Sequence, residues 1–244
     1  MPSTSYRAHP DLLVYYGSGA LTTLGRYRRV ALQSDHYTPA DVPRLTAAAT
    51  SALAYISLGE ATGPAAPWQL EERNPVWGGH YVAPGHPGWL EHVRNRVERA
   101  VADGYDGMLL DTLETPPILA GHGGELLRLV AAVREVVGNG YLLANRGYAL
   151  HRQLAPLVDG FLFEAFSTTW EGGYRALRGT ELQDNASRLR AIQATGKELY
   201  ALDYANRPGL ADFAVQRGAN LGLRVQVTDR EVTGLPLQPV PAHG

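Results

Sequence analysis

Two segments of the sequence carry a carboxylate directly after a short apolar run. In residues 104–114 a Gly-x-x-Gly turn leads into Met-Leu-Leu and then Asp111, with Glu114 three residues later, and residues 160–164 read Gly-Phe-Leu-Phe-Glu, ending at Glu164. An apolar run this short, bounded by a turn and a charge, is typical of a strand buried on both faces. Two parallel strands that end in carboxylates would place two acids side by side, which is what hydrolysis of a glycosidic bond needs.

The two segments also repeat the pattern of one face. Because side chains alternate along a strand, each segment presents a glycine, a leucine and a carboxylate on one side: Gly107, Leu109 and Asp111 in the first, and Gly160, Leu162 and Glu164 in the second. Glu164 lies among phenylalanines, so we expect it to be enclosed, and an enclosed carboxylate needs a partner or a raised pKa. Arg146 could neutralise one of the acids or bind a substrate hydroxyl.

Six further apolar segments complete a set of eight strand candidates, with helical patterns between most of them. The other strand candidates are residues 12–17, 29–35, 52–60, 140–147, 198–205 and 221–228, and the helical segments are residues 38–49, 87–102, 124–137, 150–157, 180–195 and 210–217. This alternation in 244 residues predicts an α/β fold, a single (β/α)₈ TIM barrel over residues 1–233. A doubly wound sheet is the alternative, but it does not explain why so many strands end in a polar residue. Residues 234–244 are expected to form a poorly ordered tail.

The segment after the third strand is too long for a plain connector. Residues 61–87 are rich in proline, glycine and tryptophan, include Trp68, Trp77 and His80, and show no periodicity. Such a segment indicates a functional loop over one face of the barrel. The plainer alternative is a surface flap whose tryptophans pack on the barrel rim.

Composition narrows the classes of partner. The net charge of -2 gives no basic surplus for nucleic acid, and no apolar stretch reaches the 18 or so residues of a membrane helix. The N-terminus lacks the apolar core of a signal peptide, so we expect an intracellular protein unless a leader has been removed, in which case the location is extracellular or periplasmic. There are no cysteines, which excludes disulfides and thiolate sites. A monomer is expected.

In a barrel the carboxyl ends of the strands meet at one mouth. The polar residues at these ends would form a ring, with aromatic side chains offering flat faces to sugars. The expected substrate-binding residues are Tyr16, Asp35, Tyr55, Ser57, Glu60, Trp77, Asn145, Arg146, Trp170, Asp203, Tyr204 and Gln226. An acidic ring would suit a cationic amino sugar. The structural alternative for Asp35 and Asp203 is that each caps a following helix.

Other chemistries find less support in the sequence. There is no His-Glu-x-x-His motif and no histidine cluster at ligand spacing, so no metal or other cofactor is expected. The glycines around Gly17 lack the flanks of a nucleophile elbow. Lys197 is the only lysine and lies at the wrong end of its strand for Schiff-base chemistry.

Several motifs taken together resemble a known family. Residues 53–60 (Leu-Ala-Tyr-Ile-Ser-Leu-Gly-Glu), 104–114, 144–148 (Ala-Asn-Arg-Gly-Tyr), the strand of Glu164 and residues 201–204 (Ala-Leu-Asp-Tyr) are similar, in order, to endo-α-1,4-polygalactosaminidases. These are glycoside hydrolases of families 114 and 166, which include the hydrolase domain of the Pel polysaccharide enzyme. The resemblance covers residues 52–228. It implies a (β/α)₈ barrel that cleaves α-1,4 linkages in galactosamine-containing polymers without a metal, with Asp111 and Glu164 as catalytic carboxylates.

This sequence departs from the family pattern at two places. The tryptophan-rich opening common in family 114 is not found at residues 12–17, and the second aspartate of the Leu-Asp-x-x-Asp pattern is Glu114 here.

The leading hypothesis is a retaining endo-glycosidase acting on a galactosamine- or N-acetylgalactosamine-containing polysaccharide. Asp111 would be the nucleophile and Glu164 the general acid/base with a raised pKa, although the two roles could be exchanged. The alternative is a non-catalytic glycan-binding barrel that keeps the aromatics and the acidic ring. A third hypothesis is an isomerase or lyase on a small sugar, which an enclosed lid over the site would favour.

Overall fold

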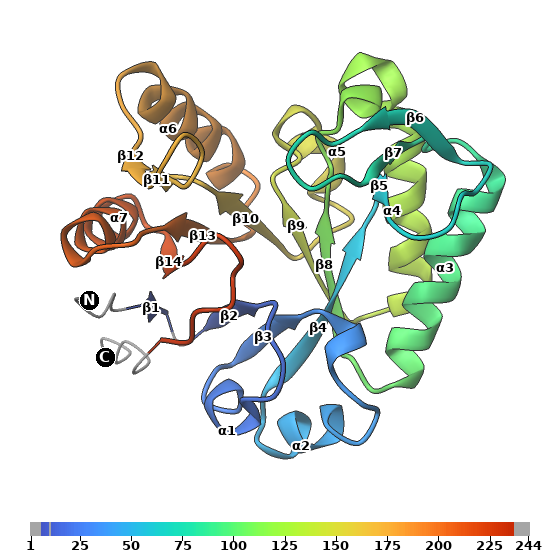
Figure 1. Ribbon diagram of the computed structural model, residues 1–244, viewed down its shortest axis with the longest axis horizontal. Helices are drawn as coiled ribbons and strands as arrows, with labels where there is room; N and C mark the ends of the chain where they lie inside the picture. Colours follow the sequence, from blue (N-terminus) through green and yellow to red (C-terminus); the bar gives the residue numbers. More distant parts are fainter. Residues whose placement is uncertain (1–5, 10, 237–244) are drawn as a thin grey trace.

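The computed structural model describes residues 6–9 and 11–236, and its main feature is a nearly closed barrel of parallel strands (Figure 1). In chain order the barrel strands are β2 (Leu12–Tyr15), β3 (Arg29–Leu32), β4 (Ser51–Ser57), β8 (Gly107–Asp111), β9 (Tyr141–Asn145), β10 (Gly160–Glu164), β13 (Glu198–Tyr204) and β14 (Arg224–Thr228). Consecutive barrel strands are hydrogen-bonded neighbours from β2 through to β14. The predicted (β/α)₈ barrel is therefore confirmed, and each strand candidate corresponds to one of these strands.

The seam between β2 and β14 is closed by a side chain instead of a backbone ladder. The amide of Gln226 on β14 accepts a hydrogen bond from Val14 N and donates one to Val14 O, both at 2.7 Å. The short strand β1 (Arg7–Ala8) pairs antiparallel with the same part of β14. Gln226 is only 4% exposed, so the expectation that it binds substrate is replaced by a structural role.

Helices connect the strands on the outside of the barrel. They are α1 (Leu21–Leu24), α2 (Val42–Ala47), α3 (Pro87–Ala102), α4 (Gly123–Val137), α5 (His151–Leu154), α6 (Thr180–Gln193) and α7 (Pro208–Asn220), with shorter turns η1 (Ser34–His36), η2 (Ile118–His122) and η3 (Tyr148–Leu150). Helix α3 has the predicted bounds because Pro87 is suited to the first helical turn and His86 Nδ1 accepts a hydrogen bond from Gly88 N at 3.1 Å.

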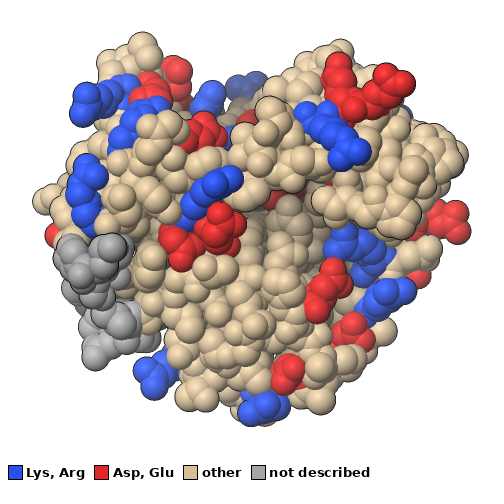
Figure 2. Space-filling view, in the orientation of Figure 1, with Lys and Arg blue, Asp and Glu red and all other residues tan. Residues whose placement is uncertain are grey.

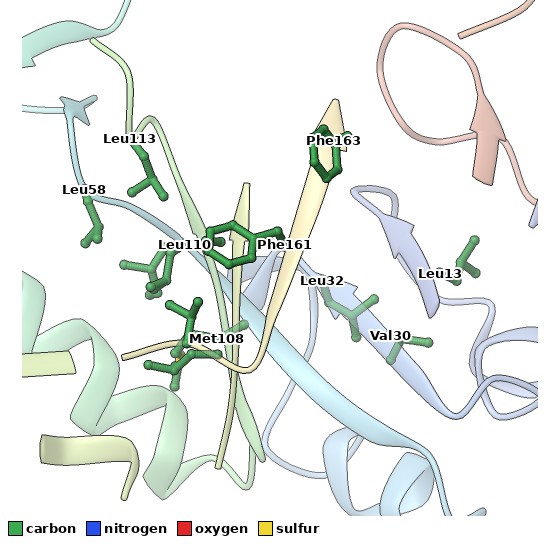
Figure 3. Close-up of a cluster of buried hydrophobic side chains, with 14 of the residues drawn as sticks. Leu13, Val30, Leu32, Leu58, Met108, Leu110, Leu113, Phe161 and Phe163 are labelled. Carbon is green, nitrogen blue, oxygen red and sulfur yellow. The ribbon is translucent and has the colours of Figure 1, made fainter. Parts of the chain in front are cut away.

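Alternation along the strands divides the core into two layers. The inner layer fills the barrel and includes Leu53, Leu109, Leu143, Leu162 and Leu202, whereas the outer layer packs against the helices (Figure 3). Gly107 and Gly160 lie on inner faces below Leu109 and Leu162, and a Cβ at either position would collide with Tyr141. The predicted face of glycine, leucine and carboxylate is therefore the inner face of both strands.

Much of the long loop predicted at residues 61–87 is folded into a small sheet on the rim, and a second small sheet follows β10. The loop after β4 forms a sheet of β5 (Glu60–Ala61), β6 (Gln69–Arg73) and β7 (His80–Val82), and the loop after β10 forms a hairpin of β11 (Thr168–Thr169) and β12 (Arg175–Ala176). Trp68 packs on α3 against Trp89 and His92, with ring centroids 6.1 and 5.4 Å apart. Trp68 is therefore a packing residue, as in the alternative of a surface flap, but it packs on α3 and not on the barrel rim.

Within residues 6–9 and 11–236, no helix is both long and apolar enough to cross a membrane. Most of the tail expected to be poorly ordered, residues 237–244, lies outside the described residues.

Candidate active site

Three neighbouring strands, β8, β9 and β10, each end in a polar side chain that points into the barrel mouth: Asp111, Asn145 and Glu164. The residue after each strand has a left-handed backbone: Thr112 with φ 62, Arg146 with φ 60 and Ala165 with φ 53. Residues other than glycine and asparagine adopt this backbone conformation at a cost of about 1 kcal/mol or more. The chain thus leaves the strand direction immediately after each of the three polar residues, which fixes them at the ends of the strands.

One amide joins the two carboxylates. Asn145 Nδ2 donates to Asp111 Oδ1 at 2.8 Å and to Glu164 Oε2 at 2.9 Å. The remaining carboxylate oxygens accept from tyrosines: Asp111 Oδ2 from Tyr55 at 2.8 Å and Glu164 Oε1 from Tyr204 at 2.7 Å. All four carboxylate oxygens are therefore hydrogen-bonded, and both acids are held by neutral donors.

The two acids differ in their electrostatics. Burial raises the pKa of Asp111, and the negative charge of Glu164 adds to this effect. Burial also acts to raise the pKa of Glu164, but the Arg146 guanidinium and the hydrogen bonds from Tyr204 and Asn145 outweigh it, so the pKa of Glu164 is lowered. Arg146 Nε lies 3.7 Å from Glu164 Oε2. This is opposite to the raised pKa that the phenylalanines around Glu164 led us to expect, because the sequence does not show how close Arg146 comes.

Tyr16 and Glu60 complete the surroundings of the pair. The ring of Tyr16 meets that of Tyr55 edge-on with centroids 5.3 Å apart, and burial with the nearby acids raises the pKa of Tyr16 well above its usual value. Glu60 accepts a hydrogen bond from Asn74 Nδ2 at 2.8 Å, and burial raises its pKa, with a further contribution from Asp111. Glu60 therefore adds a third, half-buried carboxylate close to the pair.

Two expected members of the ring, Asp35 and Asp203, lie elsewhere. Asp35 is exposed in η1, because β3 ends three residues earlier at Leu32. Asp203 is fully buried, accepts hydrogen bonds from the backbone N–H of Ser167 and Thr168, and so anchors the loop after β10. Ser57, by contrast, is the last residue of β4 and lies level with Asp111, where its hydroxyl donates to the Glu60 carbonyl at 2.7 Å.

The rim carries an aromatic cluster around a cation that the sequence did not single out. The rings of Trp77 and Trp170 meet edge-on with centroids 5.6 Å apart. The guanidinium carbon of Arg230 lies 4.9 Å from the Trp77 ring centroid and 4.6 Å from that of Trp170. Both predicted tryptophans are therefore at the mouth, and Arg230 is a missed residue, because nothing in its local sequence indicates a long-range aromatic contact.

Glu114 lies on the rim. Its Oε1 accepts a hydrogen bond from Tyr148 N at 2.7 Å, which ties the loop after β8 to the loop after β9. Figure 2 shows the surface hollowed between the part that carries α6 and the part that carries β5, β6 and β7, with acidic groups visible inside the hollow.

The fold and the site define an α/β barrel with a half-buried carboxylate pair at the carboxyl ends of its strands. No family model matches the chain. Among solved structures, the glycoside hydrolase domain of PelA from Pseudomonas aeruginosa is similar over 95% of this chain and 99% of that chain, with a TM-score of 0.85 and 24% identity. Aspergillus fumigatus Ega3, solved in complex with galactosamine, is similar over 93% of both chains, with a TM-score of 0.74 and 9% identity. These neighbours are of the type that the sequence motifs resemble.

The chain is also similar in sequence to three proteins whose functions are not characterised. An uncharacterized protein of Deinococcus radiodurans is 26% identical over 217 residues, which is 82% of this chain and 70% of that protein. Two other uncharacterized relatives are longer, and the matched region spans 59% of the protein from Methanocaldococcus jannaschii and 63% of the one from Thermotoga maritima.

Proposed function

We propose that the chain is an endo-acting glycoside hydrolase that cleaves α-1,4 linkages in a galactosamine- or N-acetylgalactosamine-containing polysaccharide, with Asp111 and Glu164 as its catalytic carboxylates. The observation that carries this proposal is the sharing of the Asn145 amide by two half-buried acids at the ends of β8 and β10, the strands on either side of β9. Barrel enzymes place their catalytic groups at this end of the strands, and paired acids at one level are the groups that glycoside hydrolysis uses.

The spacing of the pair favours retention of configuration. Because Asp111 Oδ1 and Glu164 Oε2 both lie within hydrogen-bond distance of one nitrogen, the two oxygens are no farther apart than two hydrogen bonds laid end to end. Retaining glycosidases have carboxyl groups about 5–5.5 Å apart, whereas inverting enzymes keep about 6.5–9.5 Å to admit a water molecule. The bridging Asn145 amide between the two carboxylates therefore fits the shorter separation of retaining enzymes.

The protonation of the pair suits a two-step reaction. The ionised carboxylate attacks the anomeric carbon while the protonated acid gives its proton to the departing glycosidic oxygen, and the same acid then takes a proton from the water that releases the sugar. In the free site the pKa of Asp111 is raised and that of Glu164 is lowered, so a proton taken up by the pair binds preferentially to Asp111. Because acids that share a donor titrate as one unit, we propose the two roles for the pair together.

The charge of the mouth supports an amino sugar as substrate. Asp111, Glu164 and Glu60 lie together with Arg146 as a nearby cation, so the site has negative charge to offer a ligand. An ammonium group gains from such an environment. The neighbour Ega3 was solved with galactosamine, which agrees with this choice of sugar.

The test is cleavage of galactosamine oligomers, with and without N-acetyl groups, followed by product analysis. Asp111→Asn and Glu164→Gln are each expected to lower the cleavage rate by at least about a thousandfold, which is a typical effect of removing a catalytic group. Glu114→Gln is the matched control, because it neutralises a rim carboxylate that does not contact the pair. Undiminished cleavage by both variants would reject the proposal. Oligosaccharide binding by the wild type without any shortened product would instead favour a glycan-binding barrel.

A further inference from the structure

The aromatic cluster of Trp77, Trp170 and Arg230 spans the barrel mouth. Trp77 belongs to the loop after the third barrel strand, β4, whereas Trp170 follows the sixth strand, β10, and Arg230 follows the eighth, β14. In a closed ring of eight strands, the third is three positions from both the sixth and the eighth. The contacts of Trp77 therefore reach nearly across the opening above the carboxylate pair.

The two sides of this cluster are anchored differently. Trp170 packs against the inner layer of the barrel, together with Tyr16 and Tyr55 of the site. The backbone N–H of Arg230 donates to the Tyr174 hydroxyl at 2.8 Å, which holds its loop near the same layer. Trp77, by contrast, lies in the turn between β6 and β7 and is 52% exposed. The Trp77 side can therefore separate from the fixed side without disturbing the core.

The contacts that hold the cluster together are of a kind that opens readily. An edge-on aromatic pair and a cation over a ring at an exposed site are each weak interactions. The Nε of Arg230 has no hydrogen-bond partner among the described residues, and its contacts there are the two rings and an ion pair with Glu231 at 3.7 Å. A long substrate lying across the mouth meets these side chains, and flat tryptophan rings suit the C–H faces of sugars.

We propose that Trp77, Trp170 and Arg230 form a strap that opens to admit a polysaccharide chain and closes over it as a sugar-binding subsite above the carboxylate pair. This inference rests on the proposed function and adds to it a group that recognises chain length. The strap acts on substrates long enough to extend from the carboxylates to the rim. A single sugar with an aryl leaving group, bound at the floor of the site, does not depend on it.

The test compares Trp77→Ala with Val76→Ala. Val76 is the neighbouring exposed apolar residue of the same turn, at 47% exposure, and has no part in the ring contacts. Trp77→Ala is expected to raise KM for a galactosamine polymer by about tenfold, equivalent to about 1.4 kcal/mol, and to change kcat/KM for an aryl galactosaminide by much less. Trp77→Phe should recover part of the loss, since it restores a ring. Val76→Ala should match the wild type on both substrates.

Equal effects of Trp77→Ala on the polymer and the aryl substrate, or no effect on either, would overturn the strap. Failure of the proposed function has a different signature, namely no turnover of any glycan by the wild type. In that case calorimetric binding of the polymer to the wild type, Trp77→Ala and Val76→Ala still decides the question. Weaker binding by Trp77→Ala alone supports the strap, and equal binding by all three proteins refutes it.

Discussion

Removal of the amide that joins the two acids is expected to move the pH dependence of catalysis. In Asn145→Ala, Asp111 and Glu164 each lose the hydrogen bond that now holds them at 2.8 and 2.9 Å. A donor to a carboxylate favours the ionised form and lowers the pKa. Its loss therefore raises the pKa of both acids.

The size of the shift follows from the strength of the two bonds. A hydrogen bond to a charged group contributes about 1.5–3 kcal/mol, and about 1.4 kcal/mol corresponds to one unit of pKa. Water entering the space of the lost amide replaces part of each bond. We therefore expect both limbs of the profile of kcat/KM against pH to move upward by about one to two pH units.

The assay is the rate of oligomer cleavage measured over a pH series. Asn185→Ala is the matched control, because the buried Asn185 amide also donates two hydrogen bonds, at 3.1 Å, but to the backbone carbonyls of Ala165 and Phe166. Asn185→Ala is expected to lose stability while both limbs of its pH–rate profile stay at the wild-type pH values. Limbs that stay unmoved in Asn145→Ala, or that move equally in the control, would refute the reasoning.

Three more predictions concern recognition and stability. Glu60→Gln keeps the shape of the side chain and removes its charge, so the preference for free-amine over N-acetylated oligomers is expected to fall about tenfold; an unchanged ratio of kcat/KM values would contradict this. Gln226→Leu leaves the buried N–H and C=O of Val14 unpaired, at about 1–3 kcal/mol each, so urea unfolding should show a loss of about 2–6 kcal/mol in the free energy of unfolding. Burial raises the pKa of Asp203 from 3.8 to about 6. A raised pKa means that the folded state binds the proton more tightly than the unfolded state. The free energy of unfolding is therefore greatest below pH 3.8 and falls by about 3 kcal/mol as the pH rises to about 6. Asp203→Asn should abolish this fall, and parallel stability curves for variant and wild type would argue against it.

The barrel and its central pair could be read from the sequence because both rest on local patterns. The runs before Asp111 and Glu164 are apolar, short and bounded, and alternation alone puts both carboxylates on the inner face with Leu109 and Leu162. The same rule, applied to β13, would have excluded Asp203. Tyr200, Leu202 and Tyr204 face the barrel interior, so Asp203 between them faces outward.

The rest depends on contacts between distant parts of the chain. The approach of Arg146 to Glu164, which lowers the pKa of that acid, follows from the turn after β9 and has no local signature. Arg230 meets Trp77 and Trp170 across the mouth, from three separate loops. The side chain of Gln226 closes a seam whose backbone groups belong to opposite ends of the sequence.

The left-handed residues after β8, β9 and β10 make the site separable from the loops beyond it. Thr112, Arg146 and Ala165 turn the chain away at the point where the polar side chains have just been placed. The backbone N–H groups of Arg146 and Ala165 donate to Leu162 and Leu202 on the neighbouring strands, so lengthening or exchanging the loops beyond them need not displace Asn145 or Glu164. This barrel is therefore suited to protein engineering in which rim loops are grafted to change the ligand that the mouth accepts, provided that these three positions and the strands before them are kept.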